Sequence, residues 1–294
     1  MSPKVSICIP AYNQTKYLKK TLDSILIQDY KDYEIIVTDD STTNDVYELI
    51  KTYDFNGKLM YIKNIINLGT PENWNEAIRN STGEYIKIMH HDDWFIKEYS
   101  LRKFVESLEN NPSSDFVISF AVSINEKDNI IKDFAPDDNK ISGIKKDPAN
   151  LFFGNYIGPP SSVIYRKNCN VLFDKKLKYL VDIDFYIKIL SKNRNFTLIK
   201  DPLIASVNHS THNVTNSCQT KEILVFESIY LFNNLNKRLF GKYFTYFKNL
   251  FIAYNIYYEN DLLLLGFSKK EVKKFKILLL ILRIRRIVND KKNT

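Results

Sequence analysis

Two hydrophobic periods alternate along the N-terminal part of the chain, and this alternation limits the possible folds more than any other feature. Short apolar runs typical of buried strands are separated by segments in which apolar residues recur every three or four positions, as on one face of a helix. The runs that predict strands are residues 5–9, 33–40, 59–63, 85–89 and 115–124, and those that predict helices are 18–26, 45–53, 72–80 and 100–111. Elements in this order form a mostly parallel sheet with helices on both faces, so the sequence predicts an α/β fold.

Polar side chains follow three of the predicted strands at the point where each strand ends. Tyr12 and Asn13 follow the first strand, Asp39 and Asp40 follow the second, and residues 90–93, "HHDD", follow the fourth. In open α/β sheets, ligands bind outside the carboxyl ends of the strands. We therefore expect these three clusters to form one binding site.

The remaining chain has a less regular pattern. Residues 125–160 are predicted to be rich in loops, and 160–166, 182–193 and 196–207 to form a strand, a helix and an extended segment. From about residue 219 the pattern becomes helical and rich in aromatic side chains. We expect a domain boundary there, between domains of residues 1–218 and 219–294.

The net charge of +8 is concentrated near the end of the chain. Residues 269–292 contain ten basic and two acidic side chains, so the rest of the chain is near neutral. A protein whose main function is to bind nucleic acid needs a basic core, and we therefore expect no nucleic-acid partner. The basic stretch is compatible with binding to an anionic membrane surface, and equally with a helix packed on the protein or on a second subunit of an oligomer.

Three cysteines lie far apart in the sequence, which argues against a disulfide framework and favours a reducing compartment. They are Cys8, Cys169 and Cys218. We find neither a targeting segment nor the roughly 18 consecutive apolar residues that a membrane span requires. The expectation is a soluble, cytoplasmic protein, with peripheral attachment to the inner face of a membrane if the basic stretch binds lipid.

Four segments, taken in order, resemble family 2 glycosyltransferases of the GT-A fold. They are "VSICIPAYNQTKYLKKTLDSILIQDYKDYEIIVTDDSTTND", "NLGTPENWNEAIRNSTGEYIKIMHHDDW", "PPSSVIYRKN" and "FDKKLKYLVDIDFYIKIL", and they cover about residues 4–190. The resemblance implies a Rossmann-like sheet with a nucleotide-sugar-binding half at about 1–125 and an acceptor half at about 126–218. It also implies inverting transfer of a sugar from a nucleotide-diphosphate sugar to a hydroxyl of a glycan or lipid-linked glycan, in the synthesis of surface polysaccharide or glycolipid.

The resemblance assigns a set of residues to the nucleotide sugar. Trp74 stands where many relatives carry an arginine, so help for the diphosphate from that position is lost. An aspartate at position 40 can accept the imide N–H of uracil or thymine, which favours a UDP- or dTDP-sugar over a GDP-sugar. The implied binding residues are Pro10, Ala11, Tyr12, Asn13, Asp40, Asn67, Asn75 and Asp92.

The resemblance also implies a Mn²⁺ or Mg²⁺ ion that neutralises the departing diphosphate, since both ions favour oxygen ligands. The family motif usually reads Asp-x-Asp, whereas this chain has His90 at the first position. The implied metal ligands are Asp92, Asp93 and His209. The neighbouring carboxylates of Asp92 and Asp93 are then held together by the cation. The alternative for this pair is the N-cap of the helix at 100–111.

The catalytic base implied by the resemblance is Asp182, which matches the aspartate of a Glu-Asp pair in the family. The alternative is that Asp182 caps the helix at 182–193. Two other classes of protein stay open. One is a zinc-dependent hydrolase that uses His90, His91, Asp92 and the pair His209 and His212. The other is a nucleotide-sugar-binding protein without catalysis.

Overall fold

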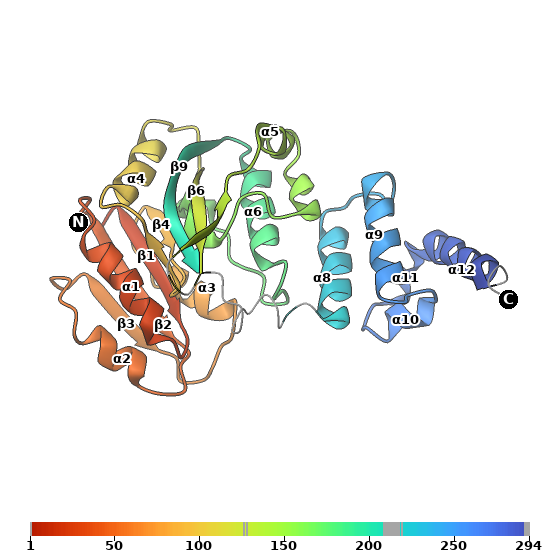
Figure 1. Cartoon of the computed structure of the whole chain (residues 1–294), viewed down its shortest axis with the longest axis horizontal. Helices are drawn as coiled ribbons and strands as arrows, with labels where there is room; N and C mark the ends of the chain where they lie inside the picture. Colours follow the sequence, from red (N-terminus) through yellow and green to blue (C-terminus); the bar gives the residue numbers. More distant parts are fainter. Residues whose placement is uncertain (1, 126, 128, 208–217, 219, 291–294) are drawn as a thin grey trace. The chain divides into compact units, whose positions relative to one another are not determined.

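The computed structural model describes residues 2–125, 127, 129–207, 218 and 220–290 (Figure 1). The chain forms two compact units, Met1–Asn213 and Val214–Thr294. In the part of the chain that is described, no helix is long and apolar enough to cross a membrane. The further division of residues 1–218 into a donor half and an acceptor half stays a prediction.

The N-terminal unit is built on one sheet with the strand order β3-β2-β1-β4-β8-β6-β9-β5, and β7 pairs with β6. Of the nine strands in the described part of the chain, β1, β2, β3, β4, β6 and β9 run in one direction, and β5, β7 and β8 run in the opposite direction. The strands are β1 (Val5–Ala11), β2 (Tyr33–Asp39), β3 (Leu59–Lys63), β4 (Tyr85–Ile88), β5 (Asp93–Phe95), β6 (Phe116–Ile124), β7 (Ile130–Phe134), β8 (Val163–Arg166) and β9 (Phe196–Val207).

Helices cover both faces of this sheet (Figure 1). The helices of the unit are α1 (Thr15–Leu26), α2 (Asp45–Ile50), α3 (Glu72–Arg79), α4 (Ser100–Glu109), α5 (Asp138–Lys146) and α6 (Val181–Lys192). The apolar stripes of α1, α2 and α4 pack in one core with alternate residues of β1 and β2. On the other face α6 packs through Phe185 against Tyr165 and through Tyr186 against Phe116, with ring centroids 5.3 and 5.8 Å apart. The predicted α/β fold is confirmed.

The segment 125–160 contains more regular structure than the sequence predicts. It holds β7, α5 and a short 3-10 helix, Pro148–Phe153. Helix α5 carries only two buried apolar residues, Ile141 and Ile144, so its hydrophobic pattern is too weak to detect. It is started by Asp137, whose side chain accepts a hydrogen bond from the Lys140 backbone N–H.

The C-terminal unit is helical, as the sequence predicts. Its helices are α8 (Lys221–Asn234), α9 (Lys242–Ala253), α10 (Glu259–Leu263), α11 (Lys269–Lys273) and α12 (Lys276–Asp290). The core of this unit is aromatic: Phe275 contacts the rings of Phe247 and Phe251 at centroid distances of 4.9 and 5.5 Å, and Phe232 lies 5.1 Å from Phe247. Edge-to-face and tilted contacts of this kind bury large apolar areas in few residues.

Candidate active site

The carboxyl ends of β1, β2 and β4 meet at one edge of the sheet, because β1 pairs in parallel with both β2 and β4. The segments that follow them are joined by hydrogen bonds. The backbone N–H of Asp40 donates to the carbonyl of Ala11 (3.0 Å), and Nδ1 of His91 lies 3.1 Å from the carbonyl oxygen of Pro10. The structure therefore brings the three predicted polar clusters together.

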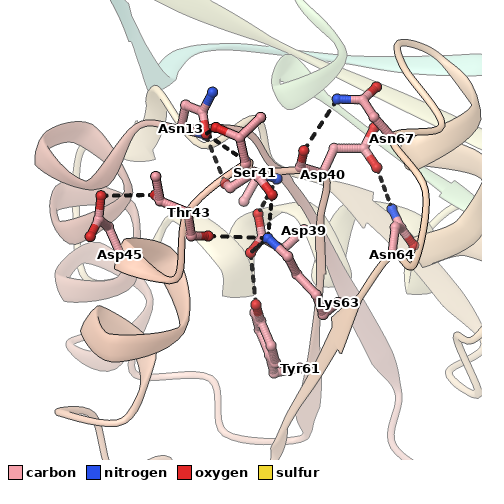
Figure 2. Close-up of polar contacts among 12 residues, drawn as sticks. Asn13, Asp39, Asp40, Ser41, Thr43, Asp45, Tyr61, Lys63, Asn64 and Asn67 are labelled. Carbon is pink, nitrogen blue, oxygen red and sulfur yellow. Dashed lines mark hydrogen bonds and ion pairs between the residues drawn. The ribbon is translucent and has the colours of Figure 1, made fainter.

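The carboxylate of Asp40 organises the loop that follows β3 (Figure 2). Its Oδ1 accepts hydrogen bonds from the Asn64 side chain (2.6 Å) and the Leu68 N–H (3.1 Å), and its Oδ2 accepts one from the Gly69 N–H (2.8 Å). Asn67 donates from its side chain to the Asp40 carbonyl (3.2 Å). Asp40 and Asn67, both predicted to bind the nucleotide sugar, thus lie together and fix the loop 64–69.

Asn13 connects the loop after β1 to the loop after β2. Its backbone has a φ of +48°, a left-handed conformation that asparagine tolerates better than most residues. The Asn13 N–H donates to the Ser41 hydroxyl (2.8 Å), and the Asn13 side-chain oxygen accepts from the Thr42 N–H (2.9 Å). This connection holds Tyr12 at the edge of the sheet, where its ring is about half exposed.

Asp39 is fully buried and already has its partners (Figure 2). Its carboxylate accepts hydrogen bonds from the Ser41 N–H (2.8 Å), the Tyr61 hydroxyl (2.7 Å) and the Lys63 ammonium (3.0 Å). Burial alone raises the pKa of Asp39, but these hydrogen bonds outweigh it and hold the pKa below its ordinary value. Asp39 therefore anchors β3 to β2 and is not available to a ligand.

His90, Asp92 and Asp93 form the group of side chains that could hold a metal ion, with potential ligand atoms all within 4.8 Å of one another. Nδ1 of His90 lies 3.9 Å from Oδ2 of Asp93. Both Oδ2 of Asp93 and Nε2 of His90 are buried without a hydrogen-bond partner among the described residues. An unpaired buried carboxylate oxygen is costly, and a divalent cation offsets that cost. The donor set of two carboxylates and one imidazole thus fits Mn²⁺ or Mg²⁺.

The backbone of this acidic loop is held from α1. The hydroxyl of Thr21 donates to the carbonyl oxygens of Asp93 (2.8 Å) and His91 (3.1 Å). Burial, followed by the charge of Asp92, raises the pKa of Asp93 above its ordinary value.

The two aspartates do not cap helix α4, because that helix has its N-cap at Tyr99. The alternative of a structural N-cap for Asp92 and Asp93 is wrong.

Trp74 contacts His90 of the acidic cluster through a tilted pair of rings, with centroids 4.5 Å apart. The neighbouring Asn75 makes two hydrogen bonds of 2.9 Å with the backbone of Phe173, as donor to its carbonyl and as acceptor from its N–H. Asn75 is thereby buried and engaged with the protein itself. We expect it to influence the nucleotide sugar through the position of Phe173 and Trp74.

Lys87 is a fully buried lysine on the strand that leads into the acidic loop, and it was not among the predicted site residues. It lies on β4, its Nζ donates to the carbonyl of Ser161, and the ring centroid of Phe104 is 4.5 Å away. Burial lowers the pKa of Lys87. The hydroxyl of Ser161 accepts a hydrogen bond from the His90 N–H (3.0 Å). A lysine in the middle of a predicted buried strand is the signal that could have identified it.

Asp182 is on α6, which begins at Val181 with Leu180 as its N-cap. Asp182 is therefore not the capping residue. Its Oδ1 is buried without a hydrogen-bond partner among the described residues, and burial raises the pKa of Asp182 to about 7. Asp184 differs, since its carboxylate pairs with Lys188 at 2.6 Å.

Asp182 and Asp93 share an electrostatic environment. Burial, followed by the charges of these two residues, raises the pKa of Tyr186, whose hydroxyl donates to the Gly158 carbonyl (2.9 Å). The carboxylates of Asp182 and Asp93 thus both contribute to the raised pKa of this tyrosine. The predicted metal ligand His209, like His212, lies outside the described residues.

Solved glycosyltransferases share this fold. The S. aureus enzyme TarS, residues 1–349 in complex with UDP-GlcNAc, matches with a TM-score of 0.62 and 20% identity over 78% of this chain and 65% of that chain. The mannosyltransferase PcManGT from Pyrobaculum calidifontis, in complex with GDP-Man and Mn2+, matches with a TM-score of 0.57 and 17% identity over 87% of this chain and 70% of its own. The architecture is that of GT-A enzymes.

The sequence comparisons define the class further. Residues 6–170, more than half of the chain, match glycosyl transferase family 2. An uncharacterised glycosyltransferase of Methanocaldococcus jannaschii is 34% identical over 207 residues, which are 69% of this chain and 70% of the relative. The chain belongs to glycosyl transferase family 2, and the predicted family and enzyme class are confirmed.

Several relatives are longer than the matched region. The poly(ribitol-phosphate) beta-glucosyltransferase of Bacillus spizizenii is 30% identical over 62% of this chain but only 32% of its own length. Glycosyltransferase GlyA of Streptococcus pneumoniae is 30% identical over 42% of this chain and 18% of its own length.

Membership of family 2 favours a glycosyltransferase over the alternative of a zinc-dependent hydrolase.

Proposed function

We propose that the protein is a metal-dependent, inverting glycosyltransferase. It transfers a sugar from a UDP- or dTDP-sugar to a hydroxyl of a glycan or lipid-linked glycan during the synthesis of surface polysaccharide or glycolipid. The observation that carries this proposal is the buried Oδ2 of Asp93 beside Asp92 at the end of β4, with the buried Oδ1 of Asp182 on α6, since neither oxygen has a hydrogen-bond partner among the described residues. One site then offers both a place for a cation and a base.

The donor is held at the edge formed by β1 and β2. Pro10 and Ala11 supply backbone, Tyr12 supplies a half-exposed ring, and Asn13 fixes the position of that ring. A carboxylate offers about four acceptor positions, and that of Asp40 uses three of them with partners among the described residues. The remaining position on Oδ2 supports a contact with the imide N–H of uracil or thymine. Asn67 contributes by holding the same loop.

The diphosphate is held near His90, Asp92 and Asp93. Asp92 and Asp93 would bind Mn²⁺ or Mg²⁺, and the predicted ligand His209 would complete the set. The ion, when bound, neutralises charge that develops on the diphosphate. Trp74 excludes water from one side of His90, since their tilted rings lie with centroids 4.5 Å apart. An arrangement of fixed charges in a site from which water is excluded is more effective than the same charges in water.

Asp182 accepts the proton of the acceptor hydroxyl. The hydroxyl oxygen forms a bond to the anomeric carbon of the sugar while the bond from that carbon to the diphosphate breaks, and the diphosphate leaves with the bonding electrons. A base works best when its pKa is near the working pH, and the pKa of Asp182 is about 7. Attack from the face opposite the leaving group inverts the configuration at the anomeric carbon.

The nature of the acceptor is supported by the relatives alone. The Bacillus spizizenii relative is named for transfer of glucose to poly(ribitol phosphate), and TarS was crystallised with UDP-GlcNAc. The name of the Bacillus relative points to a polymer that presents hydroxyl groups as the acceptor, and the TarS complex to a UDP-sugar as the donor. We therefore propose a polymeric or lipid-linked glycan acceptor for this chain.

The proposal is tested by the thermal shift that UDP-, dTDP- and GDP-sugars cause with and without Mn²⁺, together with release of the nucleoside diphosphate in the presence of an acceptor. Asp92→Asn should abolish the Mn²⁺-dependent shift. Asp182→Asn should keep that shift and lose turnover. Full turnover in Asp182→Asn would remove the base assignment, and donor binding without turnover on any acceptor would favour the non-catalytic alternative.

A further inference from the structure

Helix α12 has two apolar faces, and only one of them is used inside the C-terminal unit. The buried face consists of Leu278, Leu279 and Leu282, and it continues the packing of Phe275 just before the helix. All four side chains are at most 1% exposed. Phe275 lies at the centre of the aromatic core of the unit, 4.9 Å from the ring of Phe247. This face explains why α12 is folded onto the unit.

The second apolar face is exposed in the described part of the chain. Its six aliphatic side chains are between 37% and 73% exposed. Because successive residues of a helix are rotated by about 100°, these side chains form one continuous stripe along the helix, opposite the buried face. We call this set the exposed stripe: Ile277, Leu280, Ile281, Ile284, Ile287 and Val288.

Basic side chains border the exposed stripe. At about 100° per residue, Lys276 and Arg283 lie on one side of it and Arg285 lies on the other. The neighbouring α11 segment adds further exposed lysines. Among the described side chains of residues 269–288, Glu271 is the acidic residue, and it forms a capping box with Ser268 at the start of α11. The exposed basic residues of this region are Lys269, Lys270, Lys273, Lys274, Lys276, Arg285 and Arg286.

We propose that the exposed stripe of α12 binds an anionic lipid surface. The helix lies in the plane of the membrane with its aliphatic side chains among the acyl chains and the exposed side chains of Lys276 and Arg285 at the lipid phosphates. An amphipathic helix with a narrow apolar face and basic borders has the composition that such binding requires. This proposal goes beyond the proposed catalytic function and does not rest on it.

Charge favours a lipid surface over a second copy of the chain. A symmetric dimer through the exposed stripe pairs the same surface patch of both subunits. It would bring the basic borders of one α12 against those of the other, and neighbouring like charges repel. Anionic lipids instead neutralise the borders while they cover the stripe.

The proposal is tested by sedimentation of the full chain with vesicles, with no donor or acceptor added. The chain should bind vesicles of equimolar phosphatidylcholine and phosphatidylglycerol, and binding should weaken as salt is raised, because salt screens the attraction. Binding to phosphatidylcholine alone should be at least about tenfold weaker. The double variant Leu280→Gln/Ile284→Gln should bind the anionic vesicles at least about tenfold more weakly, and Arg285→Gln about fivefold more weakly.

The double variant Ile130→Gln/Ile131→Gln provides the matched control. These isoleucines on β7 are 64% and 50% exposed, comparable with 54% for Ile284 and 50% for Leu280, and vesicle binding should be unchanged. No binding to anionic vesicles, or equal binding by the stripe variant and the wild type, overturns the proposal. A dimer in sedimentation equilibrium that the stripe variant dissociates would assign the stripe to a second copy and also overturn it.

Discussion

The side-chain amide of Asn75 on α3 forms two hydrogen bonds of 2.9 Å with the backbone of Phe173, although 98 positions separate the two residues. The pair joins the part of the chain that carries Trp74 and the acidic loop to the segment that leads into α6. Because Asp182 lies in the first turn of α6, we propose that this contact helps to position the proposed base relative to the proposed metal site.

Replacement of Asn75 by alanine should lower the free energy of unfolding by about 2–4 kcal/mol. The change leaves a buried N–H and a buried carbonyl of Phe173 without partners, and each costs about 1–3 kcal/mol. Urea unfolding followed by circular dichroism measures the change. In the control Asn80→Ala, the lost contacts are to Glu76 on the same helix, and the cost should stay below about 1 kcal/mol. Equal losses for the two variants would contradict a special role for Asn75.

The rate of sugar transfer should rise with pH through about 7, because Asp182 accepts a proton only when it is ionised and its pKa is raised to about 7 by burial. The pH profile of kcat/KM measures this. Asp184→Asn changes a carboxylate that already pairs with Lys188, and it should leave the midpoint of the rise in place. A profile without a rise between pH 6 and 8 (about one unit to each side of the midpoint) would remove Asp182 as the base.

Asp182→Asn should stabilise the protein above pH 7. The folded-state pKa of about 7 lies above the ordinary value of 3.8, so folding favours the protonated carboxyl, and stability falls as pH rises from about 4 to about 7. The asparagine side chain does not titrate, so the variant does not lose stability in this way as the pH rises. Its Tm should match that of the wild type near pH 4. At pH 8 its Tm should be several degrees higher, which corresponds to a free energy of unfolding larger by about 1–3 kcal/mol. Differential scanning calorimetry without divalent cation shows whether the Tm difference grows with pH.

Gly83→Ala should destabilise the N-terminal unit by about 2–4 kcal/mol. A Cβ atom at this position would lie 2.7 Å from the backbone N of Ser6 and 2.9 Å from the carbonyl carbon of Val5, so β1 and the segment before β4 would have to separate. In the control Gly143→Ala on α5, the nearest atom is 3.9 Å away, and alanine should add about 0.5–1 kcal/mol of stability. Thermal unfolding of the two variants should therefore shift Tm in opposite directions.

Removal of divalent cations with EDTA should abolish transfer, and added Mn²⁺ should restore it. Asp93→Asn should raise the Mn²⁺ concentration needed for half-maximal rate by more than about tenfold, because it removes a charged oxygen ligand. Asp29→Asn provides the control, since Asp29 is a surface residue paired with Arg102 at 3.0 Å. An unchanged Mn²⁺ requirement in Asp93→Asn would exclude Asp93 as a ligand.

The local pattern of the sequence was sufficient for the α/β architecture and for the edge at which the site lies. Alternation of strand and helix periods specifies which residues face the core, and parallel strands must place their carboxyl ends together. Tyr12, Asp40 and the segment 90–93 could therefore be assigned to one edge before any contact was known. Helix α5 escaped prediction because two buried isoleucines produce too weak a pattern.

The chemical state of each side chain was decided by tertiary structure alone. Asp39 and Asp40 are neighbours of the same type, but Asp39 pairs with Tyr61 and Lys63 on β3. Asp40 instead accepts hydrogen bonds from the loop that follows β3. The sequence likewise could not show that Oδ1 of Asp182 is buried with no hydrogen-bond partner in the described part of the chain, or that α12 exposes its second apolar face. Hydrophobic period is a local property of the chain, whereas burial, hydrogen bonding and pKa depend on residues that only folding brings together.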